Sequence, residues 1–247
     1  EGDYSVRVKE QGQREVRSLA KAFNSMADRL EASDRQRRDM LADVTHELRT
    51  PLTVIRGEVE GMLDGVYPAD ETRLKSILEE TQLLSRLVDD LRTLALAEAG
   101  ALQLKREPTD VASLVRETVA AFRSVADAQG VRIESSGTES PSLEIDPARV
   151  REIISNLITN ALRYSPSGGV VIVAYDAQSI SVTDNGSGIP PEALPHVFDR
   201  FYKSNDSGGM GLGLSIAKYL VEAHGGTIHA ENVVGGGTRI SFRLSSR

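Results

Sequence analysis

Apolar residues in the first part of the chain recur at alternating spacings of three and four, which is the spacing of a coiled-coil seam. The opening seam consists of Val16, Leu19, Phe23, Met26 and Leu30. Such a period places the apolar side chains on one stripe of a long helix, and other helices must cover that stripe. This part of the chain is therefore predicted to be all-helical and to pair with other helices.

Two further seams follow. The second runs through Leu41, Leu48, Leu52, Ile55, Val59 and Met62, and the third through Leu74, Ile77, Thr81, Leu84, Val88, Leu91 and Ala95. Gly65, Tyr67 and Pro68 separate them, which predicts that the two helices fold back as a hairpin. Two such helices bury little alone, so the pattern favours a homodimeric four-helix bundle. Gly100 is expected to end the last helix as its C′ residue.

The first two seams differ in phase by one residue, and the step between them passes through Asp34 and Arg38. A stutter of this kind locally unwinds a coiled coil. We interpret the polar, out-of-phase junction as a candidate switch. The alternative is a solvated helix that simply connects two cores.

The bulk composition limits the class of protein. A length of 247 residues predicts two domains and a connector, and the net charge of −7 argues against a general nucleic-acid binder. Zero cysteines exclude disulfides and thiolate metal sites. No apolar run approaches the roughly 20 residues that span a bilayer. Because the chain opens at Glu1 without a methionine, it is expected to be a piece of a longer protein.

His46 is the candidate nucleophile. It lies about 200° round the helix from Leu48 of the second seam, so its side chain is expected to face solvent. A solvated imidazole is mostly neutral near pH 7 and keeps a lone pair with which a ring nitrogen can attack. The other three histidines, His196, His224 and His229, lack such a setting and are expected to be incidental.

The neighbours of His46 suit that role. Glu47 could accept the proton of the other ring nitrogen, although residues one apart on a helix do not face each other well. Asp43, three residues before the histidine, is a geometrically reasonable rival for that role. Thr50 is four residues after His46 and on the same face, where its hydroxyl could position a water. Pro51 lacks an N–H and is expected to bend the helix beside the histidine.

The second part of the chain changes to an alternation of helices and strands. The predicted helices are Val111–Ala128, Pro147–Tyr164 and Leu214–His224. The predicted strands are Val131–Ser135, Ser142–Ile145, Gly169–Tyr175, Ser179–Thr183, Thr227–Asn232 and Gly237–Leu244, of which the last two resemble a closing hairpin.

Four polar residues share one face of the Pro147–Tyr164 helix: Asn156, Asn160, Arg163 and Tyr164. Two amides and a guanidinium on an otherwise apolar helix are costly unless they meet a polar group. Mg²⁺ prefers oxygen ligands and usually keeps substrate phosphates among them, which the amide oxygen of Asn160 would suit. An exposed polar stripe without a ligand is the alternative.

Glycines surround the candidate nucleotide contacts. Asp184 ends a strand just before Gly186 and Gly188, where its carboxylate can accept a hydrogen bond from the exocyclic amine of adenine while the glycines let the backbone approach a flat ring. Gly211 and Gly213 precede the Leu214–His224 helix, whose free N–H groups form an anion site. In chain order, a histidine motif and a nucleotide-binding set indicate transfer of a phosphoryl group from ATP to histidine.

These segments together resemble the sensor histidine kinases of two-component signalling, in the class that carries His-Glu-x-x-Thr. The H box matches residues 46–51, the N box 156–165, the first glycine box 184–190, the F box 197–203 and the second glycine box 209–218. The opening around Phe23 and Asn24 resembles the second half of a HAMP linker. The five boxes occur in the family's order, and the resemblance extends over essentially the whole chain.

The resemblance implies a multidomain architecture. Residues 1–32 would be the C-terminal half of a HAMP-like linker, residues 33–101 the dimerisation and phosphotransfer hairpin of a dimeric four-helix bundle, and residues 108–247 an α/β sandwich ATP-binding domain of the Bergerat fold. A HAMP remnant implies that a membrane-anchored sensor precedes it, so the chain would be the cytoplasmic portion of a bacterial inner-membrane protein.

The resemblance also implies roles for individual residues. His46 would be the phosphoacceptor, Glu47 its activating base and Thr50 the residue that orients a water for dephosphorylation of a response-regulator receiver domain. Asn160 would bind Mg²⁺ beside Asn156, and Asp184 would read adenine. The remaining nucleotide contacts would come from Arg163, Tyr164, Gly186, Gly188, Lys203, Gly211, Leu212 and Gly213.

The chain departs from the family's pattern at the predicted ATP lid. The segment Lys203–Gly209 is short, Lys203 stands where an arginine is common, and Met210 replaces a small hydroxyl residue. Two other functions are alternatives to the autokinase. One is a phosphatase-dominant signalling scaffold with ATP as an effector, and the other is a chaperone- or topoisomerase-like ATPase, which the histidine motif disfavours.

Overall fold

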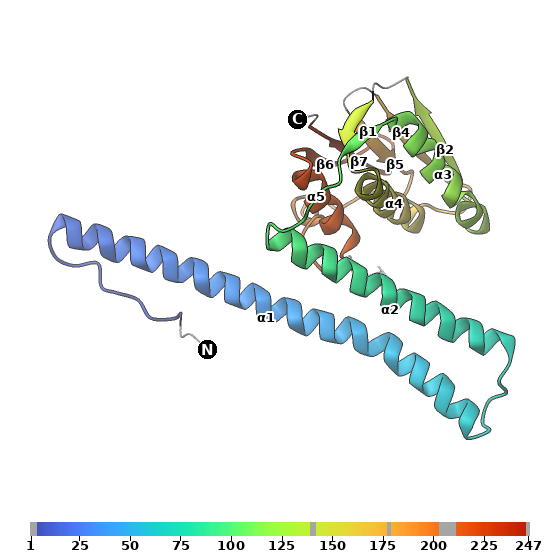
Figure 1. Ribbon diagram of the computed structural model, residues 1–247, viewed down its shortest axis with the longest axis horizontal. Coiled ribbons are helices and arrows are strands. Elements are labelled where there is room, and N and C mark those ends of the chain that lie inside the picture. The colour runs from blue at the N-terminus through green and yellow to red at the C-terminus, as the bar shows by residue number, and fades with distance from the viewer. Residues whose placement is uncertain (1–3, 139–141, 177–178, 203–210, 246–247) are drawn as a thin grey trace. The chain divides into compact units, whose positions relative to one another are not determined.

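The computed structural model describes residues 4–138, 142–176, 179–202 and 211–245 (Figure 1). The chain forms two compact units, Glu1–Ser85 and Arg86–Arg247. The first is helical and the second contains the end of one helix and an α/β domain. The predicted architecture, a helical hairpin followed by an α/β sandwich, is confirmed.

Helix α1 spans Arg14–Leu63 without interruption. Its 50 residues correspond to a length of about 75 Å at 1.5 Å per residue. The helix continues through the junction between the two seams, where Arg38 and Asp34 form an ion pair of 2.7 Å, and through Pro51. Unwinding at the stutter is a property of a paired coil and, like the bend at Pro51, stays a prediction.

Helix α2 spans Glu71–Glu98. The C-terminal ends of α1 and α2 have the same capping geometry. Gly65 and Gly100 adopt left-handed φ values of 70° and 61°. After each glycine an N–H reaches back to the last turn, from Val66 to Gly61 O and from Ala101 to Leu96 O, both at 2.9 Å. Both ends are therefore Schellman motifs, and the prediction of Gly100 as the C′ residue is confirmed.

The turn between α1 and α2 is held by side chains from both helices. Arg73 at the start of α2 forms an ion pair with Glu58 of α1 at 2.5 Å. Its guanidinium carbon lies 3.8 Å from the centre of the Tyr67 ring. The hydrogen bond with Glu58 is the largest cause that raises the pKa of Arg73. The combination of an ion pair and a cation–π contact fixes the direction in which α2 leaves the turn.

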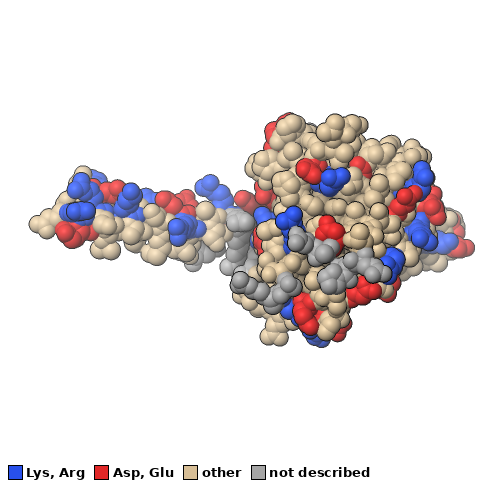
Figure 2. All heavy atoms as spheres, turned by 90° about the horizontal axis from the view of Figure 1, so that it is seen from above, with Lys and Arg blue, Asp and Glu red and all other residues tan. Residues whose placement is uncertain are grey.

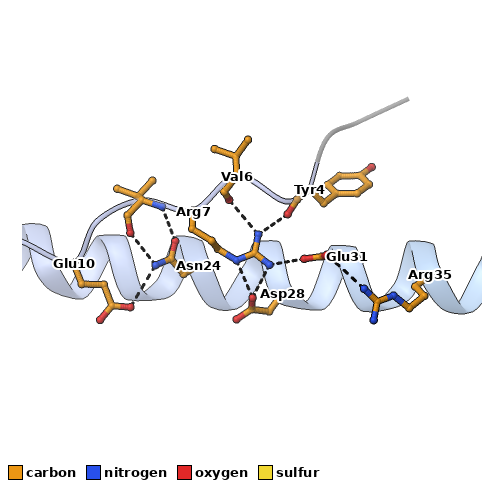
Figure 3. A network of polar contacts seen from close by, with 9 residues as sticks. Tyr4, Val6, Arg7, Glu10, Asn24, Asp28, Glu31 and Arg35 are labelled. Atoms are coloured by element: carbon orange, nitrogen blue, oxygen red, sulfur yellow. Dashed lines mark hydrogen bonds and ion pairs between the residues drawn. The ribbon is translucent and has the colours of Figure 1, made fainter.

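An extended segment before α1 is attached to that helix (Figure 3). The side-chain amide of Asn24 pairs with the backbone of Val8, accepting from its N–H and donating to its carbonyl, both at 2.9 Å. Arg7 donates to Asp28 at 2.9 Å and to Glu31 at 2.6 Å. The hydrogen bond with Glu31 is the largest cause that raises the pKa of Arg7. The segment therefore follows α1 in a fixed register.

The predicted seams of α1 and α2 are largely exposed in the single chain. All five residues of the opening seam are exposed, with Leu19 at 72%. The exposed members of the other two are Leu41, Leu52, Val59, Leu74, Thr81, Val88 and Ala95. Apolar stripes of this length remain in water unless further helices cover them, as the predicted bundle requires.

Charged residues of both signs cover the surface between these stripes. Figure 2 shows one face, on which Lys and Arg side chains are interspersed with Asp and Glu among the described residues. Several pairs lie one helical turn apart, such as Lys75 and Glu71 at 2.7 Å. Exposed pairs of this type contribute about 0.3–0.5 kcal/mol each, so they support the helices only slightly.

The second unit contains a mixed sheet, a two-stranded sheet and helices. The strands are β1 (Glu107–Thr109), β2 (Arg132–Gly137), β3 (Leu143–Ile145), β4 (Val170–Tyr175), β5 (Ser179–Thr183), β6 (Thr227–Asn232) and β7 (Thr238–Arg243). The helices are α3 (Val111–Ala128), α4 (Pro147–Tyr164), α5 (Gly213–Ala223) and the short η1 (Leu194–His196).

The main sheet has the order β2-β4-β5-β7-β6, in which β2 and β4 are parallel and the other neighbours antiparallel. Helices α3, α4 and α5 cover one face of it (Figure 1). Alternate residues of the strands point into that layer and are buried: Val171, Val173, Ile180, Val182, Ile240 and Phe242. The core of the domain lies between this sheet and these helices.

The sequence signals for these elements were accurate where caps or alternation mark them. Helices α3 and α4 begin where predicted, because Asp110 accepts from the N–H of Ser113 at 3.1 Å and Asp146 accepts from Ala148 and Arg149 at 3.1 Å. Strands β5 and β6 also have the predicted bounds. Strand β1, which pairs with β3, and η1 were missed, because three residues carry no period.

The end of α2 has a second apolar face that the seam analysis missed. Leu87 and Leu94 are one heptad apart, lie off the third seam and are 1% and 0% exposed. Thr93 is also buried, and its hydroxyl lies 3.5 Å from the guanidinium of Arg149 on α4. Arg149 in turn forms an ion pair with Glu152 at 2.7 Å. This face of α2 therefore belongs to the packing of the second unit.

A carboxyl group beside that face is perturbed. Burial is the largest cause that raises the pKa of Asp90 to about 6, and repulsion from Glu152 and Asp89 acts in the same direction. A carboxyl whose pKa is raised in the folded state binds its proton more tightly there than in the unfolded chain. The contribution of this group to the free energy of unfolding is therefore largest at low pH and falls as the pH rises from about 4 to about 6.

Replacing Asp90 by asparagine should raise the melting temperature at pH 7.5 and change it little at pH 4.5, where the carboxyl is protonated and asparagine resembles it. The gain should be a few degrees at most, because the group is partly exposed and screened. Thermal unfolding of Asp90→Asn and of the exposed control Glu222→Gln at both pH values measures the effect. An equal gain at pH 4.5 would contradict the assignment.

Candidate functional site

His46 is exposed on α1, as the seam phase predicted. The hydroxyl of Thr50 donates to the carbonyl of His46 at 3.4 Å, so the threonine lies one turn along on the same side of the helix. Asp43 is exposed and Glu47 half-buried, and both stay candidates for the group that orients the imidazole. A solvated histidine with a neighbouring hydroxyl can accept a phosphoryl group from an approaching donor.

The polar face of α4 lies beside the start of α5. The side-chain nitrogen Nδ2 of Asn156 is buried and has no hydrogen-bond partner among the described residues. A Cβ atom on Gly213, the first residue of α5, would lie 3.6 Å from Cγ of Asn156. A buried donor without a partner costs free energy, so a polar ligand bound at the N-terminus of α5 would relieve it.

Asp184 lies at the end of β5 and is 7% exposed. Its Oδ1 accepts from the N–H of Gly186 at 2.8 Å and from the N–H of Thr238 at 3.2 Å. Burial raises the pKa of Asp184, and these backbone hydrogen bonds oppose the shift. A carboxylate held in one orientation by its first oxygen can accept a further hydrogen bond, as from an exocyclic amine, at its second.

The glycine loop after Asp184 passes directly over the end of α4. A Cβ atom on Gly186 would clash with the backbone carbonyl of Tyr164, so only glycine allows this approach. Asn160 is half-buried, and Arg163 and Tyr164 are exposed. The structure therefore brings the glycine loop and the N-terminus of α5 against the same helix, at Tyr164 and Asn156 of α4.

The described part of the second glycine box, residues 211–218, contains the N-terminus of α5. Leu212, at the N-terminus of α5, is 1% exposed, and Gly211 accepts from the N–H of Phe201 at 3.0 Å. A Cβ atom on Gly211 would lie 2.7 Å from the backbone of Phe201, which explains the glycine. Lys203, Met210 and the predicted lid between them lie outside the described residues.

Asn160 is the candidate metal ligand of this site. Among residues 4–138, 142–176, 179–202 and 211–245, no three His, Asp or Glu side chains gather to hold a metal ion. A Mg²⁺ at Asn160 would therefore need the phosphates of a nucleotide and waters as its other ligands. Such a ligand set is usual for Mg²⁺ in nucleotide sites.

The residues that hold the glycine loop in place were not predicted from the sequence. Asn185 accepts from the N–H of Val170 at 2.9 Å, and the side chains of Thr238 and Asn232 lie on the β6–β7 hairpin that contacts the loop. Asn185 lies inside the first glycine box, whereas Asn232 and Thr238 are far from the motifs in sequence. Only the pairing of β7 with β5 brings them close, and no local spacing predicts it.

One prediction about a histidine was wrong. His224 was expected to be incidental, but it is fully buried at the C-terminal end of α5. Its Nδ1 lies 2.7 Å from the carbonyl of Leu220, and its Nε2 accepts from the N–H of Asp146 at 3.2 Å. Burial lowers the pKa of His224, which keeps the ring neutral. His196 and His229 are exposed.

Three family models match successive parts of the chain. The HAMP domain matches residues 1–32, the His Kinase A (phospho-acceptor) domain residues 36–100, and the histidine kinase-, DNA gyrase B- and HSP90-like ATPase residues 145–247. The solved structure of the Acinetobacter baumannii histidine kinase AdeS is 33% identical, with a TM-score of 0.69 over 82% of this chain and 98% of that chain. The chain belongs to the sensor histidine kinases.

Curated sensor kinases are also similar. The signal transduction histidine-protein kinase BaeS of Escherichia coli is 36% identical over 98% of this chain and 54% of its own length. The sensor histidine kinase WalK of Bacillus subtilis is 36% identical over 87% of this chain and 37% of its own. The chain thus spans about half the length, or less, of these relatives.

A further solved structure contains a partner. The histidine kinase ThkA, in complex with the response regulator protein TrrA, is 25% identical, with a TM-score of 0.65 over 89% of this chain and 66% of that chain. The ATPase match supports ATP as the nucleotide of this sensor kinase. Within the described ranges of the chain, no helix is both long and apolar enough to cross a membrane.

Replacing Asp184 by asparagine should weaken adenine nucleotide binding at least tenfold. The amide keeps one acceptor for the N–H groups of Gly186 and Thr238, so its NH₂ group then faces the exocyclic amine of adenine, and two donors cannot pair. Guanine carries an acceptor at that position, so the preference for ADP over GDP should shrink. Dissociation constants for both nucleotides, with the exposed Asp127→Asn as control, measure this; unchanged ADP affinity would contradict the role.

Proposed function

We propose that this chain is the catalytic portion of a bacterial sensor kinase that phosphorylates itself on His46 and passes the phosphoryl group to an aspartate of a response-regulator receiver domain. The observation that carries the proposal is an exposed histidine beside Thr50 in the phospho-acceptor region, in one chain with the site formed by α4, the glycine loop and α5. Histidine kinase relatives support the same reaction.

The reaction balances with ATP as donor. A ring nitrogen of His46 attacks the γ-phosphorus, the bond from that phosphorus to the bridging oxygen breaks, and ADP leaves with the electron pair. Glu47 or Asp43 would hold the proton of the other ring nitrogen. The phosphoryl group then passes to the carboxylate of the regulator, and His46 becomes free again.

The nucleotide would occupy the site described above. Asp184 would receive the adenine amine, the N–H groups at the start of α5 would face the phosphates, and Asn160 would hold Mg²⁺ together with those phosphates. Mg²⁺ would supply neutralisation of the charge that develops on the transferred group. The other contacts are proposed for Asn156, Arg163, Tyr164, Gly186, Gly188, Lys203, Gly211, Leu212 and Gly213.

The helical part would work as a homodimer. We propose residues 1–32 as the C-terminal half of a HAMP linker, 33–101 as the dimerisation and phosphotransfer hairpin, and 108–247 as the ATP-binding domain. The exposed seams of α1 and α2 support a four-helix bundle made by two copies. The HAMP match and the BaeS relative support a parent protein in the bacterial inner membrane, of which this chain is a cytoplasmic portion.

A second activity is favoured by the position of Thr50. Its hydroxyl lies one turn from His46 on the same side of α1, where it could orient a water toward a phosphorylated aspartate of the bound regulator. The chain would then also be a phosphatase. A phosphatase-dominant scaffold, in which ATP acts as an effector, is the alternative to a kinase-dominant protein.

The substitution His46→Gln should abolish incorporation of label from γ-labelled ATP while ADP binding stays within twofold, because the nucleotide site is on other elements. The labelled product should be acid-labile and alkali-stable, as a phosphohistidine is. His229→Gln, a second exposed histidine on β6, is the matched control and should retain full labelling. Persistent label on the His46→Gln chain would refute the assignment of the acceptor.

The substitution Thr50→Ala should slow dephosphorylation of the phosphorylated regulator at least tenfold and leave autophosphorylation nearly unchanged. The methyl group cannot orient a water, whereas the histidine is untouched. Thr45→Ala is the matched control, because Thr45 also donates to the carbonyl four residues earlier, at 2.7 Å, but lies about 100° round the helix from His46. Equal effects of the two substitutions on dephosphorylation would contradict the proposed role.

A further inference from the structure

The glycine loop of the nucleotide site, residues 184–189, is held at both ends by one cross-strand pair. Asn232 at the end of β6 and Thr238 at the start of β7 face each other in the hairpin. Thr238 holds the entry of the loop: its carbonyl accepts from the N–H of Asp184 at 2.9 Å, and its own N–H donates to the carboxylate of Asp184 at 3.2 Å.

Asn232 holds the exit of the loop in the same two-point manner. Its Oδ1 accepts from the N–H of Ile189 at 2.8 Å, and its Nδ2 donates to the carbonyl of Ile189 at 2.7 Å. A side-chain amide bonded to both backbone groups of one residue reproduces the pairing of a strand neighbour. Ile189 is thereby fixed to a hairpin that is more than forty residues away in the chain.

The hairpin turn also packs against the loop directly. A Cβ atom on Gly237 would clash with the carbonyl of Asp184, and one on Gly236 would lie 3.7 Å from the carbonyl of Gly186. A Cβ atom on Gly188 would lie 3.1 Å from Oδ1 of Asn232. The turn and the amide together leave the loop one backbone path, which passes over the end of α4.

Asn232 itself is exposed, so its hydrogen bonds do not serve to satisfy a buried amide. Their consequence is for the loop: a loop that is free at Ile189 must be ordered when a nucleotide binds, and that ordering reduces the affinity. A loop that is already fixed at both ends does not incur this cost at binding.

We propose that Asn232 is a positioning residue for the adenine nucleotide: it holds Ile189 so that the loop from Asp184 to Gly188 has its ligand-binding shape before the nucleotide arrives. The inference rests on the proposed ATP site and adds a specific support to it. Thr238 acts through its backbone, which a substitution does not remove, whereas Asn232 acts through its side chain and can be tested by mutation.

The test uses the whole chain and the variants Asn232→Ala, Asn232→Asp and Val234→Ser. Alanine removes both hydrogen bonds, aspartate keeps the acceptor for the N–H of Ile189 and loses the donor, and Val234, fully exposed at the tip of the same hairpin, is the control. ADP binding is measured by calorimetry, autophosphorylation by its KM and kcat for ATP, and the exchange rate of the Ile189 amide hydrogen by mass spectrometry or NMR.

We expect Asn232→Ala to weaken ADP binding and to raise the KM for ATP about tenfold, with kcat within twofold, because the interaction it supports is uniform binding. The Ile189 amide should exchange at least tenfold faster. Asn232→Asp should be intermediate in ADP affinity, and Val234→Ser should match the unmodified chain in every measurement. A purely structural role would lower the melting temperature without this separation of KM from kcat.

Unchanged ADP affinity in either folded variant of Asn232 overturns the inference, as does a slow, unaltered exchange of the Ile189 amide in Asn232→Ala. If alanine prevents folding, the same comparison rests on Asn232→Asp. ADP binding by the unmodified chain distinguishes a failure of the proposed function from a failure of this inference. Its failure to bind ADP overturns the proposed function, whereas ADP binding that ignores Asn232 overturns only the positioning role.

Discussion

The burial of one face of α4 is the constraint on which the nucleotide site depends. Seven residues of this helix are buried against the sheet and the neighbouring helices: Val150, Ile153, Ile154, Leu157, Ile158, Ala161 and Leu162. Fully burying a Val, Leu or Ile side chain contributes about 1.5–3 kcal/mol, so turning the helix by one residue would lose several such contributions at once. The row from Asn156 to Tyr164 therefore keeps its direction because the core on the other side cannot rotate.

Part of this could be read from the sequence. The bounds of α4, β5 and β6, the exposure of His46 and the order of the motifs all follow from local signals: a cap, an alternation or a seam phase. The residues that hold the glycine loop in place could not be predicted from the sequence. Asn232 and Thr238 matter because β7 pairs with β5 in one register, and long-range register is a property of the assembled sheet.

In the helices, too, some features could be predicted from the sequence and others could not. A single period identified the seams of α1 and α2, and the single chain leaves them exposed as a bundle requires. Period analysis assigns one stripe to a helix, however, and so it passed over Leu87 and Leu94, which are buried on another side of α2. The burial of His224 was missed for a related reason, since neither hydrogen-bond partner of its ring could be placed without the fold.

Asp146 attaches the segment before β1 to the α/β domain. Its carboxylate caps α4 and also accepts from the backbone N–H of Lys105 at 2.9 Å, while its own N–H donates to His224 at the end of α5. Strand β1, immediately after, is paired with β3. Residues 105–109 are thus attached to the α/β domain, and the attachment begins before residue 108, at which the proposed ATP-binding domain starts.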